Sequence, residues 1–262
     1  TPNVDRLLRQ SVRFGNTYVA EPTCSPSRTA LLTGMHERVN GVGFTSSYQL
    51  TRQQWERTYP ALLRKAGYYT GFIGKFGVEY GMGGKALLYD LASKIPCFVY
   101  DPALPADRRG LRRKELVSSL DITKTILDYA GVASPEFMTG ESLRPLLQGK
   151  DVPWREELFL ENLYTGRDTP FQEGVRFGKW KYIRMYDGKT GYDESDVDFS
   201  DRRPSFEMLF DLEADPGEVD NLVESQDHRD VLATLRRKCA AHSEALNRQR
   251  RALKSTVHVQ DR

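Results

Sequence analysis

The sequence predicts an α/β fold followed by a smaller antiparallel α+β subdomain, on three observations. Within residues 1–150, short apolar segments suited to strands alternate with helical segments, which is typical of a layered α/β fold. The composition then changes after Gly149-Lys150. From Glu157 onwards, short apolar segments follow one another with turn residues between them, as in an antiparallel sheet. We therefore expect two regions, residues 1–150 and residues 151–262.

The first region begins with a helix start, because Thr1 can cap a helix and Pro2 suits its first turn. This helix runs to Ser11, with Leu7, Leu8 and Val12 facing inward. The elements expected after it are a strand at 14–19, a helix from Cys24 to the C-cap Gly34, a helix at 59–66 that ends at Gly67, and short strands at 68–73 and 95–100. A helix at 115–130 follows, which ends at Gly131. Its inward-facing residues are expected to be Leu116, Leu120, Ile126 and Leu127.

The second region is expected to form antiparallel strands and one long helix. Gly178-Lys179 lies between two apolar segments, which is a hairpin signal. The stretch 186–205 is rich in Asp, Gly and Ser, and we expect it to be a mobile loop. The predicted elements are strands at 158–163, 174–177, 180–184 and 206–212 and a charged helix at 231–250.

The composition excludes several classes of function. The chain has 262 residues and a formal net charge of +2, which gives no preference for nucleic acid or for a membrane surface. No apolar run is long enough to cross a bilayer. The three cysteines, Cys24, Cys97 and Cys239, have no paired spacing, so the sequence indicates neither a disulfide framework nor a zinc site.

The segment from Cys24 to Arg28 carries the strongest chemical signal. Pro26 suits a first helical turn, so Cys24 would lie at the positive end of a helix dipole. Arg28, four residues on, would lie on the same face and share one anion-sized space with the thiol. A lone cysteine is more often a small buried apolar residue. A cysteine phosphatase fits less well, because its loop needs five residues between Cys and Arg, and here there are three.

The run from Cys24 to Gly34 resembles the sulfatase signature, Cys-x-Pro-Ser-Arg-x-x-Leu-Leu-Thr-Gly, at every specified position. The resemblance implies an alkaline-phosphatase-like α/β fold, here incomplete. It also implies that Cys24 is oxidised to Cα-formylglycine by a formylglycine-generating enzyme or a sulfatase-maturing enzyme. The hydrated aldehyde would then cleave a sulfate ester of a small molecule or glycan in two steps. Arg28 would hold the hydrated aldehyde and stabilise the developing charge.

Two lysines are further candidates through the same resemblance. Lys75 lies in Gly-Phe-Ile-Gly-Lys-Phe, which is similar to the family segment whose lysine contacts the sulfate. Lys85 lies in Gly-Gly-Lys-Ala-Leu-Leu-Tyr-Asp, which resembles the late segment whose lysine binds the sulfate or its bridging oxygen. A lysine in a glycine-rich loop is otherwise most often solvated, so the resemblance carries both assignments.

The chain departs from the family pattern in its metal site. Family members carry a strand ending in two metal-binding aspartates before the first helix, and this sequence opens at that helix. Lys75 and Lys85 are also far closer together than in the family, which places a deletion junction near residue 80. Only Cys24, as formylglycine, would remain as a ligand, so we expect the family's Ca²⁺ to bind weakly or not at all. His36 is expected to be a surface or packing residue.

Three functions therefore remain open. The first is a sulfuric ester hydrolase that uses formylglycine at Cys24. The second is a truncated sulfatase-like remnant without turnover. The third is a phosphate or phosphonate monoester hydrolase of the same superfamily.

Overall fold

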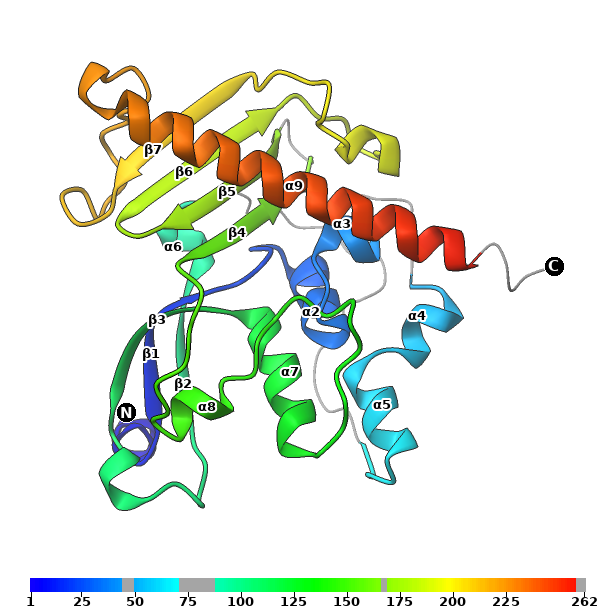
Figure 1. Ribbon diagram of the computed structural model, residues 1–262, viewed down its shortest axis with the longest axis vertical. Coiled ribbons are helices and arrows are strands. Elements are labelled where there is room, and N and C mark those ends of the chain that lie inside the picture. Colours follow the sequence, from blue (N-terminus) through cyan, green and yellow to red (C-terminus); the bar gives the residue numbers. More distant parts are fainter. Residues whose placement is uncertain (44–49, 71–87, 166–168, 258–262) are drawn as a thin grey trace.

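The computed structural model describes residues 1–43, 50–70, 88–165 and 169–257. It contains a three-stranded sheet and a four-stranded sheet, with helices packed around both (Figure 1). The long helix α9 (Arg229–Val257) lies across the larger sheet, and its middle part packs against α3 (Glu37–Asn40) from the first region. The α/β fold predicted from the sequence is therefore confirmed.

The smaller sheet has β1 (Val12–Tyr18) at its centre. Strand β2 (Lys94–Val99) pairs with β1 antiparallel, and β3 (Arg112–Ser118) pairs with it parallel. Apolar side chains of this sheet pack on residues from a later helix, α8 (Arg144–Leu147), and bury Val12, Phe14, Leu104, Val117, Leu143, Leu146 and Leu147. This core fixes the strand that leads into the Cys24 segment.

Several helices of the first region pack on one another beside this sheet. Helix α2 packs against α7 and α3, and α5 packs against both α2 and α7. The bounds are α1 (Pro2–Arg9), α2 (Cys24–Thr33), α4 (Arg52–Glu56), α5 (Tyr59–Lys65), α6 (Asp90–Ser93), the 3₁₀ turn η1 (Ala106–Arg108) and α7 (Ser119–Tyr129).

Several expected elements differ in the structure. Residues 115–118 continue strand β3, and the helix starts only at Ser119, because Ser118 caps it. The Ser118 hydroxyl accepts from the Leu120 N–H at 3.2 Å, and the Asp121 carboxylate accepts from the Ser118 N–H at 2.7 Å. Helix α1 buries none of its side chains. The prediction that Leu7 and Leu8 face a core is therefore wrong. Residues 68–70 of the strand expected at 68–73 are not in a strand, and residues 71–73 lie outside the described residues.

The larger sheet is antiparallel throughout, in the order β4-β5-β6-β7. One face packs on α9, which contributes Leu232, Leu235 and Cys239 to a shared core. The other face packs on Tyr18 and Leu116 of the smaller sheet. The bounds are β4 (Glu157–Asn162), β5 (Phe171–Phe177), β6 (Trp180–Tyr186) and β7 (Phe206–Asp211), with 3₁₀ turns η3 (Glu194–Val197) and η4 (Gln226–His228).

The connection between β6 and β7 is more ordered than its composition suggests. Tyr192, Val197 and Phe199 are buried against Phe171 and Tyr186. The ring of Phe199 stacks on that of Tyr186 at a centroid distance of 4.1 Å. The segment expected to be a mobile loop therefore folds back on the sheet.

Among the described residues, none of the helices combines the length and the apolar character that a bilayer crossing requires.

Candidate active site at the start of helix α2

Cys24 is the first residue of α2, as the sequence predicts. Thr23 precedes it in an extended conformation, and its carbonyl accepts the first helical hydrogen bond from the Ser27 N–H at 2.9 Å. Pro26 lies in the first turn, where a missing N–H costs nothing. The Cys24 side chain is exposed, with its Sγ 4.0 Å from the Ser25 hydroxyl. The thiol is thus accessible at the positive end of a ten-residue helix.

The helix that carries Cys24 is firmly held. Gly34 ends it in the left-handed conformation, with φ of 68°. Ala30 packs on Ala20 and on Leu120 of α7, and the Thr123 hydroxyl of α7 donates to a carbonyl of α2. These contacts fix the direction in which the first turn points.

Arg28 lies one turn after Cys24 and is half-buried. It lines a largely apolar cavity of about 700 Å³ between α2, α4 and α5, together with Leu31, Leu32, Trp55, Tyr59 and Leu63. Cys24 is not part of the cavity wall. The structure therefore places the two motif residues on successive turns of one fixed helix, with the guanidinium on the side of the cavity.

Lys75 and Lys85 lie outside the described residues, so their roles stay predictions. The same holds for the junction predicted near residue 80.

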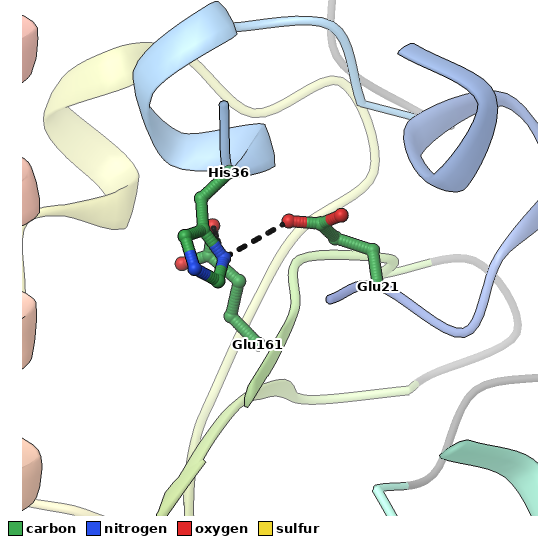
Figure 2. A group of neighbouring side chains, drawn as sticks. All are labelled: Glu21, His36 and Glu161. Carbon is green, nitrogen blue, oxygen red and sulfur yellow. Dashed lines mark ion pairs between the residues drawn. The ribbon is translucent and has the colours of Figure 1, made fainter. Parts of the chain in front are cut away.

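Of the two roles expected for His36, surface or packing residue, the structure confirms packing, because its ring lies edge-on to Phe159 at a centroid distance of 5.7 Å. It is buried, and its Nδ1 lies 3.3 Å from Glu21 Oε1 and 3.8 Å from Glu161 Oε1 (Figure 2). Burial lowers the pKa of the imidazole, but the facing Glu21 and Glu161 carboxylates outweigh it, so the pKa of His36 is raised. Burial raises the pKa of Glu21.

This cluster combines residues from both regions of the chain. Glu21 precedes the cysteine by three positions, and His36 directly precedes α3, just after the motif helix. Glu161 points inward from β4. The signal available in the sequence was a glutamate inside the apolar run Leu-Phe-Leu-Glu-Asn, because a charged residue buried in a strand needs a partner.

The residues around Cys24 do not fit the Ca²⁺ site that the family resemblance implies. In the described ranges, one group of at least three imidazole, thiol or carboxylate ligands converges, namely Glu21, His36 and Glu161. Cys24 is not in that group. Because Ca²⁺ prefers six to eight oxygen ligands, this group does not supply a calcium donor set at Cys24, and the weak or absent Ca²⁺ binding expected from the sequence stays a prediction.

Comparison with known families defines the class of protein. Residues 1–82 match the family model described as Sulfatase, and residues 78–245 match the model described as N-sulphoglucosamine sulphohydrolase, C-terminal. The second match alone covers more than half of the chain, and the two meet at residues 78–82. The chain belongs to the sulfatase family.

Individual relatives agree with this assignment. An arylsulfatase of Clostridium perfringens is 28% identical over 154 residues, which cover 58% of this chain and 28% of the relative. Human N-acetylgalactosamine-6-sulfatase is 41% identical over 86 residues, covering 29% of this chain and 16% of the relative. The N-acetylglucosamine-6-O-sulfatase of Bacteroides thetaiotaomicron is 41% identical over 76 residues, which cover 29% of this chain and 13% of the relative. The matched part of the chain thus spans well under half the length of these relatives.

Solved structures support the fold. A 2-O GAG sulfatase superposes with a TM-score of 0.73 at 16% identity, covering 96% of this chain and 88% of the other. A phosphonate monoester hydrolase from Silicibacter pomeroyi superposes with a TM-score of 0.71 at 14% identity, and the match covers 93% of this chain and 90% of the hydrolase. The alkaline-phosphatase-like α/β fold expected from the motif is confirmed by this likeness.

Proposed function

We propose that this chain is a sulfuric ester hydrolase that acts on sulfated sugars through a formylglycine formed at Cys24. The exposed thiol at the first residue of α2, within the complete motif, carries the proposal. Membership of the sulfatase family supports the reaction class. The names of the N-acetylglucosamine-6-O-sulfatase and N-acetylgalactosamine-6-sulfatase relatives support a sulfated sugar as substrate.

The modification begins with a maturing enzyme and an external two-electron acceptor. Two-electron oxidation of the Cys24 side chain gives a thioaldehyde, and water hydrolyses it to the aldehyde with release of hydrogen sulfide. An exposed position at a helix start leaves this carbon accessible to the maturing enzyme. Addition of a second water to the aldehyde gives a geminal diol.

Turnover then uses the two hydroxyl groups of the diol in sequence. One hydroxyl oxygen loses its proton and bonds to the sulfur of the ester, while the bond from sulfur to the sugar oxygen breaks and the sugar leaves protonated. The second hydroxyl loses its proton, the carbon–oxygen bond to the sulfate breaks, and the aldehyde returns. Arg28 supplies a fixed positive charge one turn away for the oxygens that gain charge.

Two measurements on the purified chain test this proposal. After coexpression with a maturing enzyme, mass spectrometry of the peptide around Cys24 should show the aldehyde. The protein should then hydrolyse an aryl sulfate faster than the matched aryl phosphate, and Cys24→Ala should abolish both signals. Arg28→Gln should lower kcat/KM by about 100-fold, the loss typical for removing one charge-stabilising group. Cys97→Ala is the matched control and should keep the aldehyde and the activity.

The outcomes separate the alternatives. An unmodified thiol without hydrolysis would favour a remnant that lacks turnover. A higher rate on the phosphate than on the sulfate would favour the phosphate or phosphonate monoester hydrolase, whose fold this chain shares.

A further inference from the structure

We propose that Glu21, His36 and Glu161 form a binding site for a divalent transition metal ion, with Zn²⁺ as the best-fitting ion. The His36 Nδ1 atom and one oxygen of each carboxylate lie within 4.8 Å of one another. Two ligand atoms that are each about 2.0–2.2 Å from a tetrahedral zinc ion are about 3.4 Å apart. The 3.3 Å and 3.8 Å separations from Nδ1 to the two oxygens suit that spacing (Figure 2).

Two buried polar atoms of this cluster lack hydrogen-bond partners. Neither His36 Nδ1 nor Glu21 Oε2 makes a hydrogen bond, although both atoms are buried. The Glu21 and Glu161 side chains are fully buried, and the His36 side chain is 9% exposed. Buried polar atoms without partners cost about 1–3 kcal/mol each. The nitrogen faces two carboxylates without a hydrogen bond to either, an arrangement that a shared cation would satisfy.

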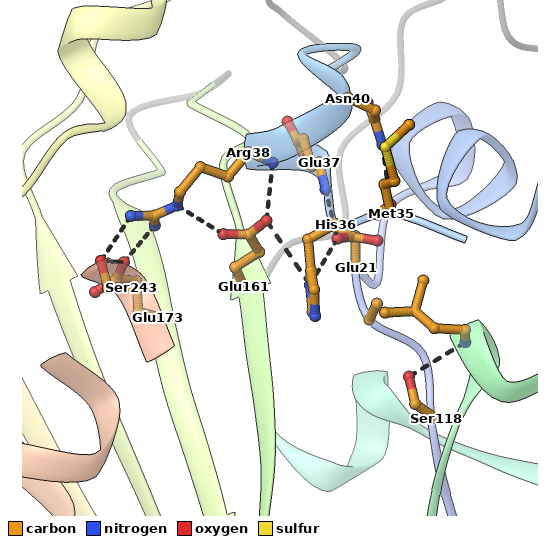
Figure 3. Close-up of polar contacts among 12 residues, drawn as sticks. Glu21, Met35, His36, Glu37, Arg38, Asn40, Ser118, Glu161, Glu173 and Ser243 are labelled. Atoms are coloured by element: carbon orange, nitrogen blue, oxygen red, sulfur yellow. Dashed lines mark hydrogen bonds and ion pairs between the residues drawn. The ribbon is translucent and has the colours of Figure 1, made fainter. Parts of the chain in front are cut away.

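The carboxylate ligands are oriented by the backbone that follows His36. The Glu37 N–H donates to Glu21 Oε1 at 2.8 Å, and the Arg38 N–H donates to Glu161 Oε1 at 2.9 Å (Figure 3). Arg38 Nε also donates to the second oxygen of Glu161 at 3.0 Å. Such supporting hydrogen bonds are typical of built metal sites, because they fix ligand direction before the ion arrives.

The donor set and the local charge favour zinc over calcium. Calcium prefers six to eight oxygens, whereas an imidazole with carboxylates suits Zn²⁺. Arg38 pairs with both Glu161 and Glu173, and Arg184 also pairs with Glu173. Among the ion pairs of the described residues, Glu21 pairs only with the imidazole of His36, so a divalent ion would compensate a carboxylate that has no other cation beside it. A proton on His36 is the competing occupant, since zinc binds only the neutral imidazole.

The test is a zinc titration of the metal-stripped full chain against a chromophoric chelator at pH 7.5. We expect one zinc ion per chain, and at least 100-fold weaker binding in His36→Gln. His228→Gln is the matched control and should bind like the parent, because that imidazole bonds to Ser225 outside the cluster. Cys24→Ser should also retain the zinc, which keeps this result independent of the proposed hydrolase function.

X-ray absorption of the zinc-loaded parent covers the case in which His36→Gln does not fold. One imidazole and only nitrogen or oxygen ligands are expected. Sulfur in the first shell, unchanged binding in a folded His36→Gln, or no zinc uptake by the parent would each overturn the proposal and leave the cluster as a protonated ion-pair network.

Discussion

Arg38 is a fully buried cation whose guanidinium reaches three elements of the second region. Its Nε lies 3.0 Å from Glu161 of β4, its Nη2 pairs with Glu173 of β5, and its Nη1 donates to the Ser243 hydroxyl of α9 at 2.8 Å (Figure 3). Removing one partner of a buried ion pair leaves the other charge without compensation, which is the costly change.

Replacing Arg38 should therefore destabilise the protein strongly. We expect Arg38→Met to lower the free energy of unfolding by about 3–5 kcal/mol, because Glu161 and Glu173 would remain buried. Urea unfolding measures the effect. Arg248→Met is the control, since Arg248 pairs with Glu244 on the exposed face of α9 and should matter little. Equally small losses in both variants would show that the buried charge is dispensable.

The sequence predicted part of the site at the residue scale. The position of Cys24 at a helix start followed from Pro26 and Gly34, because those residues act locally on the backbone. The cluster around His36 did not follow, because Glu161 lies 123 residues from Arg38 and only the folded chain brings them together. No local pattern encodes such a contact.

At the scale of elements, the predictions succeeded where residues close together in the sequence determine the local backbone structure. The two-residue turn at Gly178-Lys179 joins β5 and β6 as expected. The start of α7 was misplaced, because Leu116 and Leu120 fit a helical spacing as well as they fit a strand followed by a helix. The Ser118 cap marks the true boundary.

The connection between β6 and β7 is tied to α9 through Asp198. Arg251 Nη2 lies 2.6 Å from its carboxylate, and the Asn247 amide donates to it at 3.2 Å. Burial raises the pKa of Asp198, but hydrogen bonds from Ser200 and Arg251 outweigh it and lower the pKa to about 2. A carboxyl group whose pKa is lowered on folding stabilises the fold above its unfolded pKa, near 4, and loses that contribution as the pH falls towards 2.

Asp198→Asn should consequently destabilise the protein at pH 6 and much less at pH 2.5. Urea unfolding of parent and variant between these values gives the difference. Asp201→Asn changes an exposed aspartate of the same connection and serves as the control, with a small difference throughout. A loss for Asp198→Asn that stays constant down to pH 2.5 would contradict the assignment.

At the scale of the whole molecule, the two regions share their core. Met35 and Val39, which flank the start of α3, pack with Val175 of β5 and Leu235 of α9. Tyr18 and Leu116 of the smaller sheet pack on the opposite face of the larger one. The alternation of strands and helices predicted the fold class. The parallel pairing of β1 with β3 across the intervening chain could not be predicted, because it depends on contacts distant in sequence.

Both regions should accordingly unfold in one transition. Near-ultraviolet and far-ultraviolet circular dichroism should give the same urea midpoint. Met35→Ala in the first region and Leu235→Ala in the second should each lower the free energy of unfolding by about 2–5 kcal/mol and shift both signals together. Val219→Ala, at a site that is 79% exposed, should leave the midpoint nearly unchanged. Separate midpoints would show that the regions fold independently.

The hydrogen bond between Arg38 and Ser243 joins residues 205 positions apart. On the ribosome, the segment around Cys24 emerges long before α9, its eventual neighbour, has been made. At about 5–20 residues per second, this interval lasts roughly 10–40 s. During that time the Cys24 thiol belongs to a nascent chain whose core is still unfinished.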